Sequence, residues 1–357
     1  MYVLGVETSC DETACAVVQN GKKILSNIVA SSLEDHKPYG GIIPEIACRS
    51  HVEFMVAVLE RALKKARLCY EDIGLISVTN GPGLPGSLLV GLATAKALSF
   101  AKKIPLLGVD HLQAHLYACL MRPRPPRFPL VGMVVSGGHT SIFNIEAVDR
   151  FKKIAETQDD ACGEAFDKVA KMLGLGYPGG PLIERRARAG NPKAFSFPPP
   201  IAHPHSLNFS FSGIKTAVLY KIKELQGMQI QPKGKRRPKD AIPPKPLRPS
   251  VIDDLCASFQ KVVIETLMQR AQLACERFCA NTLLLGGGVV SNQALREEFQ
   301  KRFQRAGLGV LFPPKGLSLD NAAMVAGLGY QLFRKGSRSS LDLACEPLGA
   351  NYSAAQN

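Results

Sequence analysis

The feature that most constrains the fold is a pattern that occurs twice: an apolar strand, a short polar tip and a second apolar strand. The first copy has strands at Tyr2–Val6 and Ala14–Val18, separated by a tip rich in Asp, Glu, Ser and Thr. The second has strands at Leu130–Val135 and Ile142–Ile145, separated by a tip that contains two glycines. A restart of this kind within 357 residues predicts two similar halves.

Strands and helices alternate along the rest of the chain, which is the pattern of an α/β protein. Further strands are expected at 24–31, 75–79, 106–109, 282–285 and 310–312, and helices at 46–67, 88–102, 111–120, 162–174, 181–189, 251–279, 292–306 and 322–333. Two facing halves suit a nucleotide clamped between them, with the backbone N–H groups of each tip directed at phosphates. This is the layout of the ASKHA superfamily (actin, sugar kinases, Hsp70 ATPase), and we divide the chain into subdomains 1–128 and 129–335 and a tail 336–357.

Two histidines, His111 and His115, are four positions apart in the segment DHLQAH. Residues at i and i+4 share one face of a helix, so both imidazoles can bind one metal ion. Position 112 is Leu, so the Glu of the metalloprotease motif H-E-x-x-H is missing. A metal site needs a third ligand, and the candidate is Asp320, just before the last long helix. The alternative for Asp320 is an ordinary helix N-cap.

Glycine-rich segments mark other places where a nucleotide can contact the backbone. Gly137 and Gly138 in the second tip allow close approach of a phosphate, and Ser136 and Thr140 add hydroxyls. Three glycines at 286–288 either let an adenine or ribose pack on the backbone or form a plain strand-to-helix turn.

A carboxylate on an expected short helix offers a further contact. Asp167 could hydrogen-bond ribose hydroxyls, or it could be a surface charge on its helix. The next helix opens at the glycine pair 179–180.

Nine segments together resemble the tRNA N6-adenosine threonylcarbamoyltransferase family, once labelled glycoprotease. They are VETSCDET, NGPGLPGSLLVG, DHLQAH, VSGGHT, GEAFDKVAK, GYPGGP, FSFSGIKT, LGGGVVSN and SLDNAAM. They occur in the order found in the family and cover about residues 1–335.

The resemblance implies a transferase that uses threonylcarbamoyl-adenylate (threonylcarbamoyl-AMP) as donor. The acceptor is N6 of the adenosine 3′ of the anticodon in tRNAs that read codons beginning with A, and AMP leaves (t6A formation). An alternative is an ATP-dependent small-molecule kinase or ATPase of the same fold. A third hypothesis, a non-catalytic scaffold, is disfavoured by the intact metal-binding residues and the polar tips.

The resemblance also implies the site residues. One divalent ion per subunit, Fe²⁺ or alternatively Zn²⁺, is expected on His111, His115 and Asp320. Nucleotide-contacting positions are expected at Val135, Ser136, Gly137, Gly138, His139, Asp167, Gly180 and Asn292, with Glu184 as a nearby acidic position.

Two carboxylates on the first tip, Asp11 and Glu12, are candidates for the catalytic base. The exocyclic amine of adenosine is a weak nucleophile, so the mixed carbamic–phosphoric anhydride must activate the carbonyl carbon. Asp11 or Glu12 would then accept the amine proton or place the acceptor base. We favour Glu12 as a hypothesis.

Two features depart from the family pattern. Gln113 stands where many members have Glu between the two histidines, which leaves the inferred ligands intact but changes the charge around them. Residues 226–250 have no counterpart that we can match.

The net charge of +14 is concentrated in two Pro-rich segments. Residues 226–250 hold seven Lys or Arg against Asp240 alone, and residues 121–129 add three Arg. The prolines exclude helix and central strand. These segments are either solvated loops or basic arms that bind a tRNA phosphate backbone.

The remaining sequence features concern location and partners. No run of about 18 apolar residues exists, so no membrane span is expected. The first residues lead directly into a strand without the layout of a signal peptide, which favours a cytoplasmic protein. Ten cysteines without a C-x-x-C pair predict buried reduced thiols, including Cys10, Cys15 and Cys119.

The family also implies helpers. They are a separate synthase that supplies the adenylate, a degenerate paralogue (TsaB type) and a small ATPase (TsaE type), with a homodimer in isolation. The apolar helix expected at 46–67 is either the face that binds the paralogue or a helix packed within its own subdomain.

Overall fold

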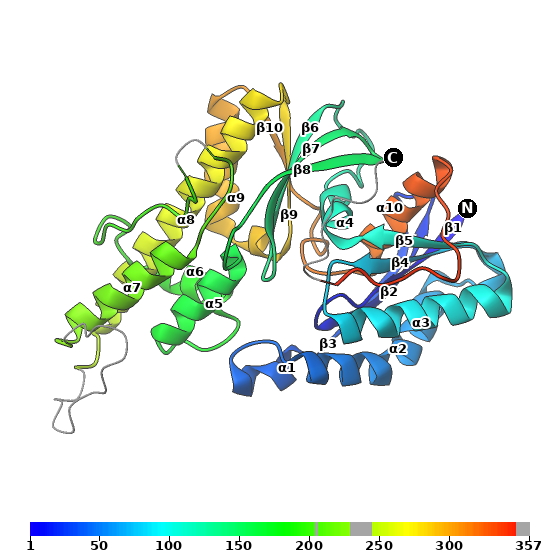
Figure 1. Ribbon diagram of the computed structural model, residues 1–357, viewed down its shortest axis with the longest axis horizontal. Helices are drawn as coiled ribbons and strands as arrows, with labels where there is room; N and C mark the ends of the chain where they lie inside the picture. The colour runs from blue at the N-terminus through cyan, green and yellow to red at the C-terminus, as the bar shows by residue number, and fades with distance from the viewer. Residues whose placement is uncertain (204–205, 229–244, 348–357) are drawn as a thin grey trace.

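The computed structural model describes residues 1–203, 206–228 and 245–347. It contains two five-stranded mixed sheets, with strand orders β3-β2-β1-β4-β5 and β8-β7-β6-β9-β10 (Figure 1). In both sheets the first three strands in this order are antiparallel neighbours, and the last three are parallel neighbours. The restart predicted from the sequence is therefore confirmed, because the two halves share one topology.

The elements have the following bounds. The first sheet is built from β1 (Tyr2–Glu7), β2 (Glu12–Gln19), β3 (Lys23–Ser31), β4 (Ile73–Gly81) and β5 (Leu106–Asp110). The second is built from β6 (Leu130–Val135), β7 (Thr140–Ala147), β8 (Arg150–Glu156), β9 (Thr282–Gly286) and β10 (Gly309–Leu311). The α-helices are α1 (Leu33–His36), α2 (Pro44–Ala66), α3 (Pro85–Lys102), α4 (His111–Ala118), α5 (Cys162–Met172), α6 (Gly179–Ala187), α7 (Ser212–Leu225), α8 (Pro249–Arg277), α9 (Gln293–Arg305) and α10 (Ala322–Arg334). The sequence analysis did not predict β8, because two consecutive lysines at 152–153 interrupt its alternation.

Both faces of the central strands are buried, which explains their continuous apolar sequences. Along β1, Leu4 and Val6 contribute to the core beneath α2 and α3, whereas Val3 contributes to a second core that contains α4 and α10. That second core also includes Val134 of β6 and Leu284 of β9. The two halves therefore share one apolar core, which fixes their relative position.

The last helix lies away from its neighbours in sequence. Although α10 follows the second sheet, it packs against β1, β2 and β4 of the first (Figure 1). The loop 312–321 therefore runs from the second half back to the first. The subdomain boundaries at 128 and 335 stay a prediction, and this packing shows that the C-terminal stretch contributes one helix to the N-terminal sheet.

The described part of the chain has no helix long and apolar enough to cross a membrane. All ten cysteines carry free thiols, with Cys15 and Cys119 buried and Cys10 half-buried.

Candidate metal and nucleotide site

Three predicted metal ligands come together where the two halves meet. His111 and His115 lie one turn apart on α4, with their ring centroids 4.6 Å apart. The His115 Nε2 lies 3.0 Å from Asp320 Oδ1, and the His111 Nε2 lies 3.7 Å from the same oxygen. One ligand atom from each residue lies within 4.8 Å of the other two. The triad therefore converges on one point.

A buried carboxylate orients the first histidine. Glu7, at the end of β1, is fully buried, and its Oε2 lies 3.0 Å from His111 Nδ1. The same carboxylate accepts hydrogen bonds from Ser9 N at 2.6 Å and from Thr79 Oγ1 at 2.6 Å. Because an ionised carboxylate only accepts, Nδ1 of His111 must carry the proton. His111 Nε2 is therefore the nitrogen directed at Asp320 and available to a metal ion.

The charges of the triad reinforce one another. Burial acts to lower the pKa of His111, but the Glu7 and Asp320 carboxylates raise it to about 9. Burial acts to raise the pKa of Asp320, but the charges of His111 and His115 hold it well below its usual range. The site therefore concentrates negative charge on oxygen beside two imidazoles, which is the environment of a cation.

This donor set fits a divalent metal ion. Two imidazole nitrogens and one carboxylate oxygen form the ligand set typical of non-haem Fe(II) sites, and Zn²⁺ accepts the same ligands. The carboxylate of Glu7 supplies the outer hydrogen bond that metal-bound histidines almost always make.

Asp320 is not the N-cap of α10, so that alternative is wrong. The cap is Asn321, whose side chain accepts a hydrogen bond from Met324 N at 3.1 Å. The Asn321 Nδ2 also donates to Leu319 O at 2.8 Å. These bonds fix the loop and leave the Asp320 carboxylate directed at the histidines.

The second tip forms a tight turn between β6 and β7. Ser136 N donates to His139 O at 2.8 Å, and Ser136 Oγ accepts from His139 N at 3.1 Å. Gly137 and Gly138 are exposed, and no atom lies within 4 Å of the place where either would carry a Cβ. Val135 is buried at the end of β6. Backbone at Gly137 and Gly138 is therefore open to a ligand.

His139 links this turn to the triad. Its Nε2 is buried without a hydrogen-bond partner among the described residues. Burial and the charge of His111 lower the pKa of His139 to about 3, while Asp320 acts in the opposite direction. The neutral ring therefore lies within electrostatic reach of the triad.

The remaining predicted nucleotide residues gather around α6. The Asp167 Oδ1 accepts from Gly179 N at 2.7 Å, which fixes the start of α6, and the backbone of Gly180 is open. Burial raises the pKa of Asp167 to about 6. Glu184 accepts from Gln293 N at 2.9 Å, next to Asn292, which caps α9.

Two side chains that were predicted to contact the nucleotide already form hydrogen bonds within the protein. The Asn292 side chain donates to Gln260 Oε1 at 2.7 Å and accepts from Leu295 N at 3.0 Å. The Thr140 hydroxyl accepts from Cys162 N at 2.9 Å, so it supports α5. Its location explains this use, because Thr140 is buried in β7.

Close backbone packing explains two of the three glycines at 286–288. A Cβ on Gly286 would lie 2.7 Å from the carbonyl oxygen of His115. Gly287 has φ +96° and would place a Cβ 2.4 Å from the carbonyl oxygen of Val135. The strand-to-helix turn therefore explains these two glycines, and they hold α4 and β6 close to the end of β9.

The first tip presents the two candidate catalytic carboxyls. Asp11 is buried and Glu12 is half-buried at the start of β2. Burial, followed by the charges of Asp320 and Asp11, raises the pKa of Glu12 well above its usual range. The hydroxyl of Thr8 donates to Ser87 O at 2.8 Å, so it is not free for a phosphate.

Glu7 and Thr79 are site residues that the sequence analysis missed. Both residues lie near the carboxyl ends of their strands, Glu7 in β1 and Thr79 in β4. Because β1, β4 and β5 are parallel, these ends meet at one edge of the sheet, and this position was a signal that could have found them. His111 follows β5 at that same edge.

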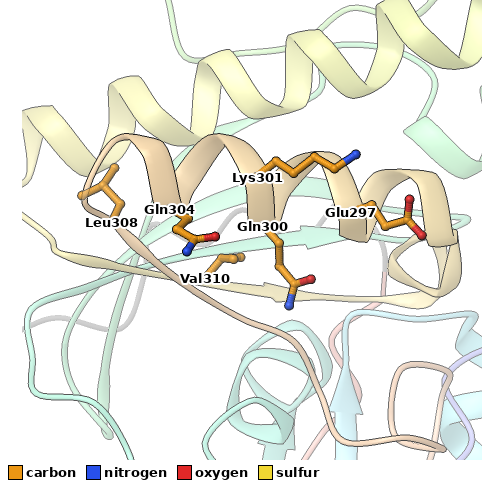
Figure 2. A pocket seen from close by; sticks show the side chains of 6 residues that line it. All are labelled: Glu297, Gln300, Lys301, Gln304, Leu308 and Val310. Carbon is orange, nitrogen blue, oxygen red and sulfur yellow. The ribbon is translucent and has the colours of Figure 1, made fainter.

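A surface groove of about 500 Å³ lies elsewhere, along the outer face of α9 (Figure 2). Its lining is Glu297, Gln300, Lys301, Gln304, Leu308 and Val310, so none of the predicted site residues contributes. Four exposed side chains of α9 and the half-buried Leu308 and Val310 line it, and we assign no chemistry to it.

Solved structures define the fold class. The chain resembles HypF of T. kodakarensis with a TM-score of 0.61 at 15% identity, over 96% of this chain and 48% of that one. It resembles the ROK hexokinase of Thermus thermophilus with a TM-score of 0.50 at 14% identity, over 94% and 100% of the two chains. The protein has the two-domain ASKHA fold.

Sequence relatives define the family within that fold. Residues 23–327 match the family described as tRNA N6-adenosine threonylcarbamoyltransferase. A relative of that name from Protochlamydia amoebophila is 48% identical over 98% of this chain and 97% of its own. Another from Bacillus subtilis is 45% identical over 97% and 95%. The chain belongs to the tRNA N6-adenosine threonylcarbamoyltransferase family.

We expect Asp320→Asn to weaken binding of a divalent ion by at least about 100-fold, because a ligand is lost. Glu7→Gln should weaken it by about 10- to 100-fold, because His111 loses its charged hydrogen-bond acceptor. Calorimetric titration with Zn²⁺ and with anaerobic Fe²⁺, together with elemental analysis, measures both. Asp149→Asn in an exposed turn is the control, and wild-type affinity in Asp320→Asn would rule out this site.

We expect Asp167→Asn to stabilise the protein at pH 7.5. A carboxyl whose pKa rises to about 6 on folding destabilises the folded state once it ionises, and this penalty vanishes near the ordinary value of 3.8. The gain should be about 1–2 kcal/mol, or a few degrees in melting temperature, and should disappear by pH 4. Thermal unfolding at both pH values tests this, with Asp149→Asn as the control. An equal shift at both values would contradict it.

Proposed function

We propose that the protein transfers a threonylcarbamoyl group from threonylcarbamoyl-AMP to N6 of an adenosine in tRNA. Its relatives carry the name tRNA N6-adenosine threonylcarbamoyltransferase, which gives the group and the acceptor atom. The observation that most supports the proposal is the adjacency of a metal-ligand triad to an open glycine turn, linked by His139. The acceptor that we propose is the adenosine 3′ of the anticodon in tRNAs that read codons beginning with A.

The donor nucleotide would lie on the second half. In this proposal the backbone N–H groups of Gly137 and Gly138 bind its phosphate, as expected for open glycine backbone. Asp167 and Gly180 contact the ribose, and Glu184 and Asn292 border the same surface. Val135, Ser136 and His139 hold the turn in place.

We propose Fe²⁺ as the ion bound by the triad, with Zn²⁺ as the alternative. When bound there, a divalent cation supplies Lewis-acid stabilisation of the charge on the phosphate oxygens. Glu7 keeps His111 in the tautomer that exposes Nε2, and Asn321 keeps the loop of Asp320 in place.

The first half would supply the group that accepts the proton released by N6. The N6 nitrogen attacks the carbonyl carbon of the donor, the N–C bond forms, and the bond from that carbon to the phosphate oxygen breaks. AMP leaves with the electron pair of that bond. Glu12, half-buried on the first tip, accepts the proton from N6 as the general base. Asp11 adjoins it in the chain.

The sequence offered an ATP-dependent kinase or ATPase of the same fold as the alternative, and the comparisons do not favour it. No observation favours it over the transferase, and the relatives that match nearly the whole chain are named as transferases.

The partners follow from the same proposal. We propose that the degenerate paralogue (TsaB type) docks on the apolar groove of about 460 Å³ between α2 and α3. Three of its side chains support this, because Val52 and Val56 are each 64% exposed and Leu89 is 55% exposed. A second copy of this chain would use the same groove in a homodimer. A small ATPase (TsaE type) and a separate synthase complete the proposed cytoplasmic system.

We expect the protein, with threonine, bicarbonate, ATP, synthase and partner proteins, to form threonylcarbamoyladenosine in tRNA. Nucleoside analysis by mass spectrometry measures it. Glu12→Gln should lower the transfer rate by about 10²- to 10⁴-fold and leave AMP affinity unchanged, because it removes only the proton acceptor. Absence of the nucleoside where a B. subtilis relative produces it would refute the function. Normal transfer by Glu12→Gln would refute only the base assignment.

We expect the basic Pro-rich segments to bind tRNA phosphates. Most of segment 226–250 lies outside the described residues, so the test uses Arg124 and Arg127, which are exposed on the loop before β6. Replacing both by Ser should weaken tRNA binding and reduce the slope of log affinity against log salt by about 2. The paired change of Lys22 and Lys23 to Ser, two exposed lysines on the β2–β3 turn, is the control. An unchanged slope would leave these arginines as solvated charges.

A further inference from the structure

A buried histidine outside the metal site binds both ends of the tip that carries the carboxyl pair. His51 lies on α2 and is fully buried. Its Nε2 lies 2.9 Å from the carbonyl oxygen of Cys10, and its Nδ1 lies 2.8 Å from the hydroxyl oxygen of Thr13. These two bonds span Asp11 and Glu12, which lie between Cys10 and Thr13.

The chemistry of the two partners fixes the state of the ring. A carbonyl oxygen only accepts, so Nε2 of His51 must donate to Cys10. Burial lowers the pKa of His51, so the ring is neutral and its Nδ1 accepts the proton of the Thr13 hydroxyl. A neutral histidine with one donor and one acceptor satisfies both groups, which no aliphatic side chain of similar volume could do.

Other elements hold the same short segment from different sides. The Cys10 carbonyl also accepts from Ser87 Oγ on α3 at 3.2 Å. The Asp11 carbonyl accepts from Ser32 Oγ at 3.0 Å, and that hydroxyl lies 3.1 Å from Nε2 of the buried His36. The backbone around the carboxyl pair is therefore fixed.

We propose that His51 is a positioning residue for transfer, acting through Glu12. This inference rests on the proposed function. His51 itself is separated from any substrate by the tip that it holds. Its contribution is to fix the peptide groups on either side of the two carboxyls, so that Glu12 meets the N6 proton at one distance. A displacement of about 1 Å in such a group lowers rates by about 100-fold.

Three variants separate the two hydrogen bonds. His51→Gln can keep a donor near the place of Nε2 and loses the acceptor at Nδ1, whereas His51→Asn does the opposite. Thr13→Val removes only the hydroxyl at nearly constant volume and remains informative if the His51 variants fold poorly. Thr266→Val on α8 is the matched control, because it also removes a buried hydroxyl, which bonds to Val262 O at 2.9 Å.

We expect each of the three variants to lower kcat for transfer by about 10- to 100-fold. KM for the donor and the affinity for AMP should stay within about twofold of wild type, because the nucleotide contacts lie on the second half. Thr266→Val should keep wild-type kcat. A loss confined to melting temperature, with kcat unchanged, would overturn the proposal.

The double variant His51→Gln with Glu12→Gln tests whether His51 acts through Glu12. In Glu12→Gln the carboxylate is already absent, so His51→Gln should cause no further loss of kcat. An equal fold-loss in both backgrounds would show that His51 acts by another path and would overturn the inference. Hydrogen exchange of the backbone amides at residues 10–13 gives a readout without activity, and it should accelerate in His51→Asn but not in Thr266→Val.

The wild-type activity distinguishes an error in the proposed function from an error in the role of His51. If the proposed function is wrong, wild-type protein makes no threonylcarbamoyladenosine. If the positioning role is wrong, wild-type protein is active and the His51 variants match it in kcat and in exchange.

Discussion

The hydrogen bond between Glu7 and His111 is the interaction on which the site most depends. A fully buried carboxylate is tolerated only with partners, and Glu7 has Ser9 N, the Thr79 hydroxyl and His111 Nδ1. These contacts tie β1 to β4 and α4 while they select the tautomer of His111. The same charge therefore fixes the parallel edge of the first sheet and the orientation of His111, a proposed metal ligand.

The two halves share a topology but use their tips differently. In the first tip the hydroxyls of Thr8 and Thr13 are turned inward, to Ser87 and His51, and two carboxyls remain for chemistry. In the second tip exposed glycines leave the backbone open. A repeated strand–tip–strand unit thus carries two carboxyls in one half and an open glycine turn in the other, which suits the proposed transfer between a phosphate-bearing donor and an amine.

Periodicity in the sequence was enough to predict most strands and helices, because the central strands of both sheets are continuous apolar runs. The spacing of His111 and His115 likewise predicted a shared helix face, and the structure confirms that they converge. The role of Glu7 was not predictable in this way, since it depends on which strands become neighbours. The choice between Asp320 and Asn321 as helix cap was also hidden, because both residue types cap helices and only the backbone conformation separates them.

Because of the route of the chain, the triad can form only when both halves are folded and packed together. Two of the proposed ligands lie on α4 in the first half, but the third comes from the loop that returns from β10 to α10. That loop reaches α4 only when α10 has packed on the first sheet and the shared core between the halves has formed. Any ion held by all three residues binds the folded chain more tightly than the unfolded one, so its binding energy stabilises the contact between the halves. Gly286 of β9 packs on the carbonyl of His115 and Gly287 packs on the carbonyl of Val135, so the arrangement that completes the triad also fixes the start of the second tip relative to α4. The contact between the two halves must therefore form before the three residues of the triad can come together.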